Sequence, residues 1–159
     1  MTDNSPIIGH VHLTVADLDR SLTFYRDLLG FDVTTKYGDS AVFLSKGGYH
    51  HHIGLNTWSG KGAEPPPHGH SGLYHFAILF PERKELAKVL KKIIESKYPV
   101  TGFSDHGVSE AIYLNDPDGI GVELYFDRPR EDWNVKANGE IEMVTEPLDI
   151  NDLLMELEK

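Results

Sequence analysis

The stretch Gly9-His10-Val11-His12-Leu13-Thr14-Val15 decides the fold, because a second stretch repeats its pattern later in the chain. Tyr74-His75-Phe76-Ala77-Ile78-Leu79-Phe80 has the same short apolar character, and its His75 follows His10 by 75 − 10 = 65 positions. Each stretch is typical of a β-strand, and each leads into a helical pattern. The chain is therefore expected to contain two copies of one structural unit.

The first copy is expected to cover about residues 7–58. Asp17 is suited to the N-cap of its helix, and Gly30 to the left-handed position that ends it. Between them, leucines and one tyrosine recur at helical spacing: Leu18, Leu22, Tyr25, Leu28 and Leu29. Four strands are predicted around this helix: Ile7–Val15, Phe31–Tyr37, Ser40–Ser45 and Tyr49–Trp58.

The second copy is expected to cover about residues 72–126. Its helix is predicted from Pro81, in the first turn, to about Ser96. The buried stripe of this helix is predicted to consist of Leu86, Val89, Leu90, Ile93 and Ile94. The strands are predicted at Leu73–Phe80, Val100–Phe103, Ser109–Leu114 and Gly121–Phe126.

Both copies therefore have the order βαβββ, which predicts an α+β fold. The two βαβββ modules are expected to form one curved mixed sheet, a half-open barrel, around one metal site with the helices outside. Residues 1–133 are expected to be a single domain, and residues 134–159 a C-terminal extension that is partly helical near Asn151–Leu157.

The composition narrows the classes of partner and of chemistry. The formal charge of 15 − 25 = −10 argues against nucleic acid and anionic membranes, which bind basic surfaces. The chain has no cysteine, so disulfides, thiolate metal sites and cysteine nucleophiles are excluded. The first six residues lack the features of a signal peptide, and no apolar run approaches the roughly 20 residues of a membrane span. A cytoplasmic protein is expected.

Strand alternation places a set of histidines, tyrosines and one glutamate on one face of the sheet. His10 and His75 alternate with apolar neighbours on their strands, and so does Glu123 in Gly121–Phe126. A solvated sheet face is the simpler explanation of polar residues, but such faces are normally rich in Lys, Glu, Thr and Ser. Two histidines and one carboxylate from different strands form a ligand set suited to Fe(II) or Mn(II).

The duplicated unit and its motifs resemble the vicinal oxygen chelate superfamily. This superfamily includes glyoxalases, extradiol ring-cleaving dioxygenases, fosfomycin-modifying enzymes and bleomycin-binding proteins. The opening motif consists of Ile8–Leu13 with Asp17–Ser21 and Phe24-Tyr25. Three further segments are similar to the bacterial catechol-2,3-dioxygenase type: Gly47–Asn56, Gly72–Leu79, and Asp105–Ala111 continuing through Tyr113–Gly119 to Glu123–Tyr125.

The resemblance implies a ring-cleaving dioxygenase that acts on a small aromatic diol with O₂. It assigns His10, His75 and Glu123 as the ligands of one divalent metal ion, and Tyr113 as the active-site tyrosine. It further places His52, or its strand neighbour His50, as the histidine that handles protons, and His106 near another polar position of the pocket. Fe(II) is the expected metal and Mn(II) the alternative, while Zn or Ni could substitute.

Other readings stay open. A glyoxalase would have a fourth ligand, usually Glu, between Tyr49 and Trp58, where no acid occurs. A glyoxalase-like isomerase or lyase remains the main alternative, followed by a non-catalytic binding member, and the run His50-His51-His52 could be an adventitious metal site. A homodimer is expected, because edge strands need cover and the tail has an apolar stripe of Leu148, Ile150, Leu153, Leu154 and Leu157.

Overall fold

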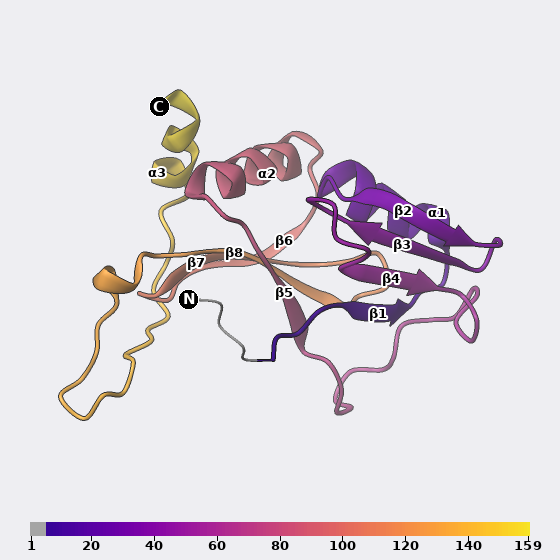
Figure 1. Ribbon diagram of the computed structural model, residues 1–159, viewed down its shortest axis with the longest axis horizontal. Helices are drawn as coiled ribbons and strands as arrows, with labels where there is room; N and C mark the ends of the chain where they lie inside the picture. The colour runs from indigo at the N-terminus through magenta and orange to yellow at the C-terminus, as the bar shows by residue number, and fades with distance from the viewer. Residues whose placement is uncertain (1–5) are drawn as a thin grey trace. The chain divides into compact units, whose positions relative to one another are not determined.

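The computed structural model describes residues 6–159. The chain divides between His68 and Gly69 into two compact units, each containing a four-stranded mixed sheet and helices (Figure 1). Within the described residues, none of the helices has the length and apolar character that crossing a membrane requires.

The two sheets have the same topology. The first sheet has the order β1-β4-β3-β2 and the second the order β5-β8-β7-β6, with the outer pairs β1–β4 and β5–β8 parallel and the other pairs antiparallel. This repeat confirms the α+β class and the βαβββ order. The described strands form two four-stranded sheets and not the one curved sheet that was predicted, because the strands of each module pair among themselves. Closure around a metal stays a prediction. The strands are β1 Val11–Thr14, β2 Asp32–Tyr37, β3 Ala41–Ser45, β4 Ile53–Asn56, β5 His75–Leu79, β6 Val100–Asp105, β7 Ser109–Asn115 and β8 Gly121–Asp127.

The first helix starts and ends as predicted but changes type in the middle. The Asp17 carboxylate accepts a hydrogen bond from the Arg20 backbone N–H at 2.8 Å, and Gly30 has a φ of +82°. Between them, α1 (Leu18–Leu22) continues as a π-helix over Thr23–Leu28. A π turn holds more residues than an α turn, so the adjacent Phe24 and Tyr25 both pack into the core.

The second helix, α2 (Arg83–Glu95), lies against β8 and buries most of the predicted stripe. The prediction for Pro81 is wrong, because Glu82 is the N-cap and Pro81 therefore precedes the helix. The prediction for Ile94 is also wrong: Ile94 is 49% exposed, because in the last turn it is Ile93, 1% exposed, that faces the core. Ala87 is buried in the stripe instead.

Two strands of the first unit are shorter than predicted. The parallel pairing of β1 with β4 runs from Val11 opposite Ile53 to Thr14 opposite Asn56, and both strands end where this pairing ends. Ile7 and Ile8 are therefore exposed and outside the sheet. Residues 49–52 also lie outside regular strand structure, so strand alternation does not decide where their histidines point.

The chain after β8 folds back within the second unit. A short 3-10 helix, Arg130–Asp132, is followed by an extended segment in which Glu146 forms a β-bridge with Asp105. α3 (Ile150–Met155) begins at the N-cap Asp149 and continues as a 3-10 helix over Glu156–Glu158. Leu153 is 0% exposed where α3 lies against α2, so at least this part of the apolar tail is covered by its own chain.

Candidate functional site

Three of the predicted site residues share one face of the second sheet. Glu123 on β8 stands opposite Tyr113 on β7 and opposite Ala77 on β5. His75 is two positions before Ala77 on the same strand, so its side chain is on the same face. On the opposite face, Ile112, Val122 and Leu124 are buried. Strand alternation therefore predicted correctly that these three side chains share one face, while their roles in a site stay a prediction.

His75 and Glu123 approach each other closely. The Nε2 atom of His75 lies 2.9 Å from Oε2 of Glu123. Two neighbouring ligands of an octahedral ion, each about 2.1 Å from it and at right angles, are themselves about 3 Å apart. The pair therefore fits two adjacent coordination positions of one divalent cation, and its imidazole and carboxylate groups suit Fe(II) or Mn(II).

The ring of His75 is oriented mainly by packing. It lies between Tyr74 and Tyr113, with ring centroids 5.4 Å and 5.7 Å away. Its second nitrogen, Nδ1, is buried and has no hydrogen-bond partner among the described residues. A metal-binding histidine usually donates this second N–H to a fixed acceptor, and for His75 the ring contacts with the two tyrosines stand where that acceptor would be.

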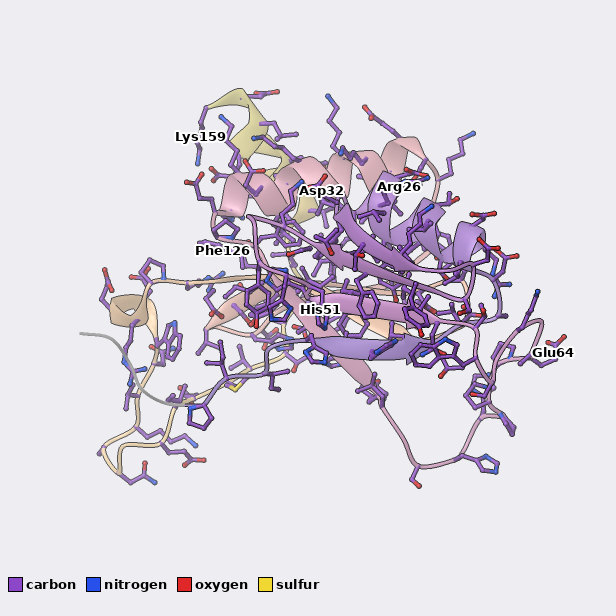
Figure 2. All side chains as sticks on the ribbon, turned by 45° about the vertical axis from the view of Figure 1, so that its right-hand side comes forward. Arg26, Asp32, His51, Glu64, Phe126 and Lys159 are labelled. Atoms are coloured by element: carbon purple, nitrogen blue, oxygen red, sulfur yellow. The ribbon has the colours of Figure 1, made fainter. Side chains whose placement is uncertain are left out.

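His10 belongs to the other compact unit, just before β1. Its ring is exposed and lies 4.4 Å from the ring of His51, measured between centroids (Figure 2 labels His51). In the part of the chain that the structure describes, no three His, Asp or Glu side chains are grouped so that they could hold one ion. The ligand set of His10, His75 and Glu123 therefore stays a prediction.

Tyr113 connects Glu123 with His106. Its hydroxyl lies 3.2 Å from Oε1 of Glu123 and 2.7 Å from Nε2 of His106. Burial, reinforced by the negative charge of Glu123, raises the pKa of Tyr113 to about 12. The hydroxyl therefore keeps its proton at neutral pH. Of the three candidate proton-handling histidines, His106 is the one in hydrogen-bond contact with this tyrosine.

The other two candidate histidines are held within the first unit. Nδ1 of His52 lies 3.0 Å from the Ser45 hydroxyl and accepts a hydrogen bond from the Lys46 backbone N–H at 3.3 Å. His50 is exposed, and its Nδ1 lies 2.7 Å from Nδ1 of His51. His52 is thus anchored to the end of β3.

His51 is the member of the histidine run that the sequence did not single out. Its ring lies between those of His10 and His50, with centroid distances of 4.4 Å and 4.5 Å. Partial burial and then the neighbouring His10 lower the pKa of His51 from its ordinary value. The run of three histidines was visible in the sequence, but the family resemblance pointed to its first and third members.

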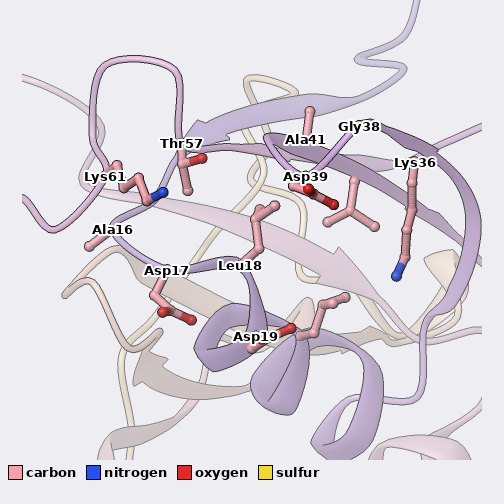
Figure 3. Close-up of a pocket in the computed structure, with 12 residues that line it drawn as sticks. Ala16, Asp17, Leu18, Asp19, Lys36, Gly38, Asp39, Ala41, Thr57 and Lys61 are labelled. Carbon is pink, nitrogen blue, oxygen red and sulfur yellow. The ribbon is translucent and has the colours of Figure 1, made fainter.

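A separate hollow of about 340 Å³ lies in the first unit (Figure 3). Charged residues of both signs line it, including Asp17, Asp39, Lys36 and Lys61. None of the predicted site residues belongs to this lining, and the Asp17 carboxylate already caps α1. The hollow therefore offers no alternative location for the predicted chemistry.

Comparison with known proteins gives the same family as the motifs. A family profile, the Glyoxalase/Bleomycin resistance protein/Dioxygenase superfamily, matches residues 7–124. The catechol-2,3-dioxygenase of Bacillus subtilis (strain 168) is 42% identical over 149 residues, which are 94% of this chain and 51% of that protein. Biphenyl-2,3-diol 1,2-dioxygenase 3 of Rhodococcus globerulus is 33% identical over 77% of this chain and 64% of its own length. The chain thus spans about half to two thirds of these relatives.

Solved structures share the fold. A lactoylglutathione lyase from Agrobacterium tumefaciens superposes with a TM-score of 0.59 at 25% identity, over 78% of this chain and 96% of that one. A glyoxalase/dioxygenase from Nostoc punctiforme reaches a TM-score of 0.67 at 19% identity, over 81% and 96%. The matching profile, the relatives and the repeated βαβββ sheets agree. The chain therefore belongs to the glyoxalase/bleomycin resistance protein/dioxygenase superfamily.

Proposed function

We propose that this protein is an extradiol-type dioxygenase, which cleaves the ring of a catechol-like diol with O₂. The observation that carries the proposal is the chain of contacts that joins His75, Glu123, Tyr113 and His106. The names of the relatives from B. subtilis and R. globerulus support an aromatic diol as the substrate class. His10, His75 and Glu123 would hold the metal, Fe(II) or Mn(II), and leave coordination positions open for substrate and O₂.

When bound, the metal supplies Lewis-acid and redox chemistry. The protein's own residues then have distinct tasks in this proposal. Tyr113, which remains protonated at neutral pH, orients a substrate oxygen by hydrogen bonding. A histidine takes the substrate proton and later returns one, since an ordinary histidine pKa lies near neutrality. His106 is the leading candidate because it contacts Tyr113, followed by His52 and His50.

The test is anaerobic reconstitution of untagged protein with Fe(II), followed by exposure to a panel of catechols in air. Oxygen uptake that depends on both iron and catechol, with formation of a yellow semialdehyde, is expected. About one metal ion per chain is expected before treatment, and His75→Ala and Glu123→Ala should lose it. Retention of full metal by His10→Ala, His75→Ala and Glu123→Ala alike would refute the ligand set.

A glyoxalase-like isomerase is the second candidate, favoured by the likeness to a lactoylglutathione lyase. Isomerisation of methylglyoxal–thiol adducts, together with no turnover of any catechol, would support it. A metal-loaded protein that turns over neither substrate would instead be a binding member of the family. The homodimer is a separate proposal, and light scattering that returns a monomer mass at micromolar concentration would contradict it.

A further inference from the structure

The extended segment Glu142–Glu146, here called the strap, runs beside the end of β6. Backbone hydrogen bonds join Asp105 and Glu146 in both directions, at 2.8 Å and 2.9 Å, and the Val144 N–H donates to the His106 carbonyl at 3.1 Å. The strap therefore lies alongside the end of β6 and next to His106, the residue that contacts Tyr113. Its position is set by backbone groups of β6 and of the turn that follows it.

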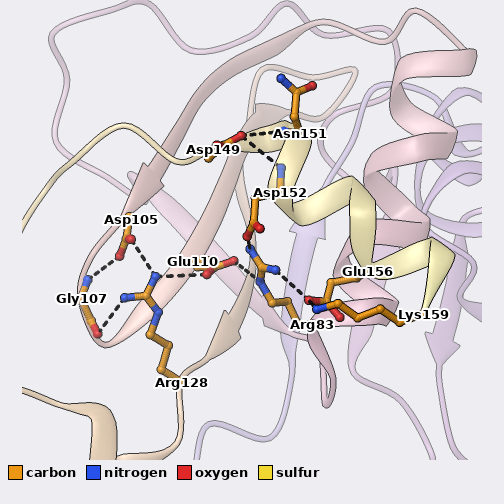
Figure 4. A network of polar contacts seen from close by, with 10 residues as sticks. All are labelled: Arg83, Asp105, Gly107, Glu110, Arg128, Asp149, Asn151, Asp152, Glu156 and Lys159. Atoms are coloured by element: carbon orange, nitrogen blue, oxygen red, sulfur yellow. Dashed lines mark hydrogen bonds and ion pairs between the residues drawn. The ribbon is translucent and has the colours of Figure 1, made fainter.

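The chain that follows the strap is fastened to the rest of the unit by charged side chains (Figure 4). Arg83 on α2 bonds Asp152 and Glu156 of the C-terminal segment at 2.7 Å and 2.9 Å, and also bonds the buried Glu110 on β7 at 2.8 Å. Arg128 joins the same Glu110 at 3.1 Å to the Asp105 carboxylate at 2.7 Å. At the other end of the strap the Glu142 N–H donates to the Asn134 carbonyl at 2.8 Å, so the strap is held at both ends.

The strap also contacts the side chain of His106. The carbonyl oxygen of Val144 lies 2.7 Å from Nδ1 of that ring. A carbonyl can only accept a hydrogen bond, so Nδ1 must be the nitrogen that carries the proton. A neutral imidazole has one protonated nitrogen, and Nε2 is then an acceptor.

The acceptor at Nε2 influences where the Tyr113 proton points. The Tyr113 hydroxyl has one proton and two neighbouring acceptors, Nε2 of His106 at 2.7 Å and Oε1 of Glu123 at 3.2 Å. The imidazole nitrogen is the nearer acceptor and the Glu123 carboxylate is the charged one, so the two compete for the single proton of Tyr113. When that proton lies toward Nε2 of His106, the Tyr113 oxygen can accept a hydrogen bond from a proton-bearing hydroxyl of a ligand.

We propose that the strap is a positioning element of the site, which fixes the Nδ1–H tautomer of His106 and thereby directs the Tyr113 hydroxyl. This inference rests on the proposed function and adds a detail to it. The site would receive a diol with at least one protonated hydroxyl, and that hydroxyl donates a hydrogen bond to Tyr113. Val144 acts through its backbone carbonyl, so the identity of its side chain is of little importance. Residues 142–146 are then part of the working site although they touch no substrate.

The test reads the tautomer directly in the full chain. Protein carrying ¹⁵N-histidine and diamagnetic Zn(II) is examined by two-bond nitrogen–proton NMR at about pH 8, above the ordinary histidine pKa of about 6.5. His106 is expected as the Nδ1–H tautomer, in contrast to the Nε2–H form that free imidazole side chains favour. Tyr113→Phe should leave this tautomer unchanged, because the Val144 carbonyl alone suffices to fix it.

Val144→Pro removes the N–H that bonds the His106 carbonyl and should release the ring into a mixture of tautomers. Ala137→Pro is the matched control, since it places proline in the same extension, at the second position of the turn closed by the Gly139 N–H and the Lys136 carbonyl. Its His106 spectrum should equal the wild type. Unchanged spectra of the remaining histidines report that each variant is folded.

An Nε2–H tautomer in the wild type, or identical spectra for Val144→Pro and Ala137→Pro, would overturn the inference. Oxygen uptake with catechol is measured separately on the iron-loaded proteins, where Val144→Pro should reduce turnover by about 10²-fold. A wild type without uptake on any catechol refutes the proposed function, while the tautomer spectra still decide the role of the strap.

Discussion

Removing the carboxylate of Glu110 should destabilise the second unit strongly. This side chain is 6% exposed and accepts hydrogen bonds from Arg83 at 2.8 Å and Arg128 at 3.1 Å. A hydrogen bond to a charged group contributes about 1.5–3 kcal/mol, so two at the lower end give about 3 kcal/mol. Breaking a buried ion pair from one side costs about 3–5 kcal/mol, and the lower end applies because both arginines keep other carboxylate partners.

The free energy of unfolding of Glu110→Ala is measured by urea titration in a Trp58→Phe background. The remaining Trp133, whose indole N–H donates to the Arg128 carbonyl at 2.8 Å, then reports on the second unit. Asp152→Ala is the control: it removes a 57% exposed partner of the same Arg83 and should cost at most about 1 kcal/mol. A loss for Glu110→Ala below about 1 kcal/mol, or equal to the control, would refute the reasoning.

Three further changes test the site and the tail. Gly121→Ala should lower stability by about 1–3 kcal/mol and weaken metal binding, because a Cβ there would lie 2.2 Å from the Tyr74 carbonyl oxygen beside His75. Gly102→Ala on the same sheet, with its nearest neighbour at 3.9 Å, should behave like the wild type in both assays. The ionisation of Tyr113 is measured as the difference between the ultraviolet pH titrations of the metal-free wild type and of Tyr113→Phe. This difference should have its midpoint near pH 12, and a midpoint at the ordinary tyrosine pKa of about 10 would contradict the burial argument. Since this folded-state pKa is raised, the stability that Tyr113 contributes is complete below about pH 10 and is lost between about pH 10 and 12. Leu153→Ala should cost about 2–5 kcal/mol in thermal or urea unfolding, and a negligible loss would mean that the tail is not docked as described.

The sequence predicted the repeated βαβββ order because strand and helix periodicities are local properties. It placed His75, Glu123 and Tyr113 on one face because all three lie inside regular strands, where alternation holds. The same rule does not extend to residues 49–52, which lie outside regular strand structure, and His52 among them is positioned by contacts with Ser45 and Lys46.

Other features depended on tertiary context. The π-helix over Thr23–Leu28 lets two adjacent aromatic residues enter the core, which a count of helical spacing cannot reveal. The contact of the Val144 carbonyl with His106 joins residues 38 positions apart through a backbone atom, and a backbone atom leaves no mark on residue type. His106 could therefore be chosen as a candidate from the sequence, but its tautomer could not be inferred.

The order of strands in each sheet has a consequence for the chain as it leaves the ribosome. In both sheets the first strand pairs with the last, so β5 can form its sheet hydrogen bonds only after β8 has been synthesised. From Leu79 to Gly121 this means 121 − 79 = 42 residues, or roughly 2–8 s at translation rates of about 5–20 residues per second. During this interval the backbone of β5, including His75, lacks its sheet partner. A chaperone or a slow codon acting in this interval would influence the yield of active protein without touching the finished molecule.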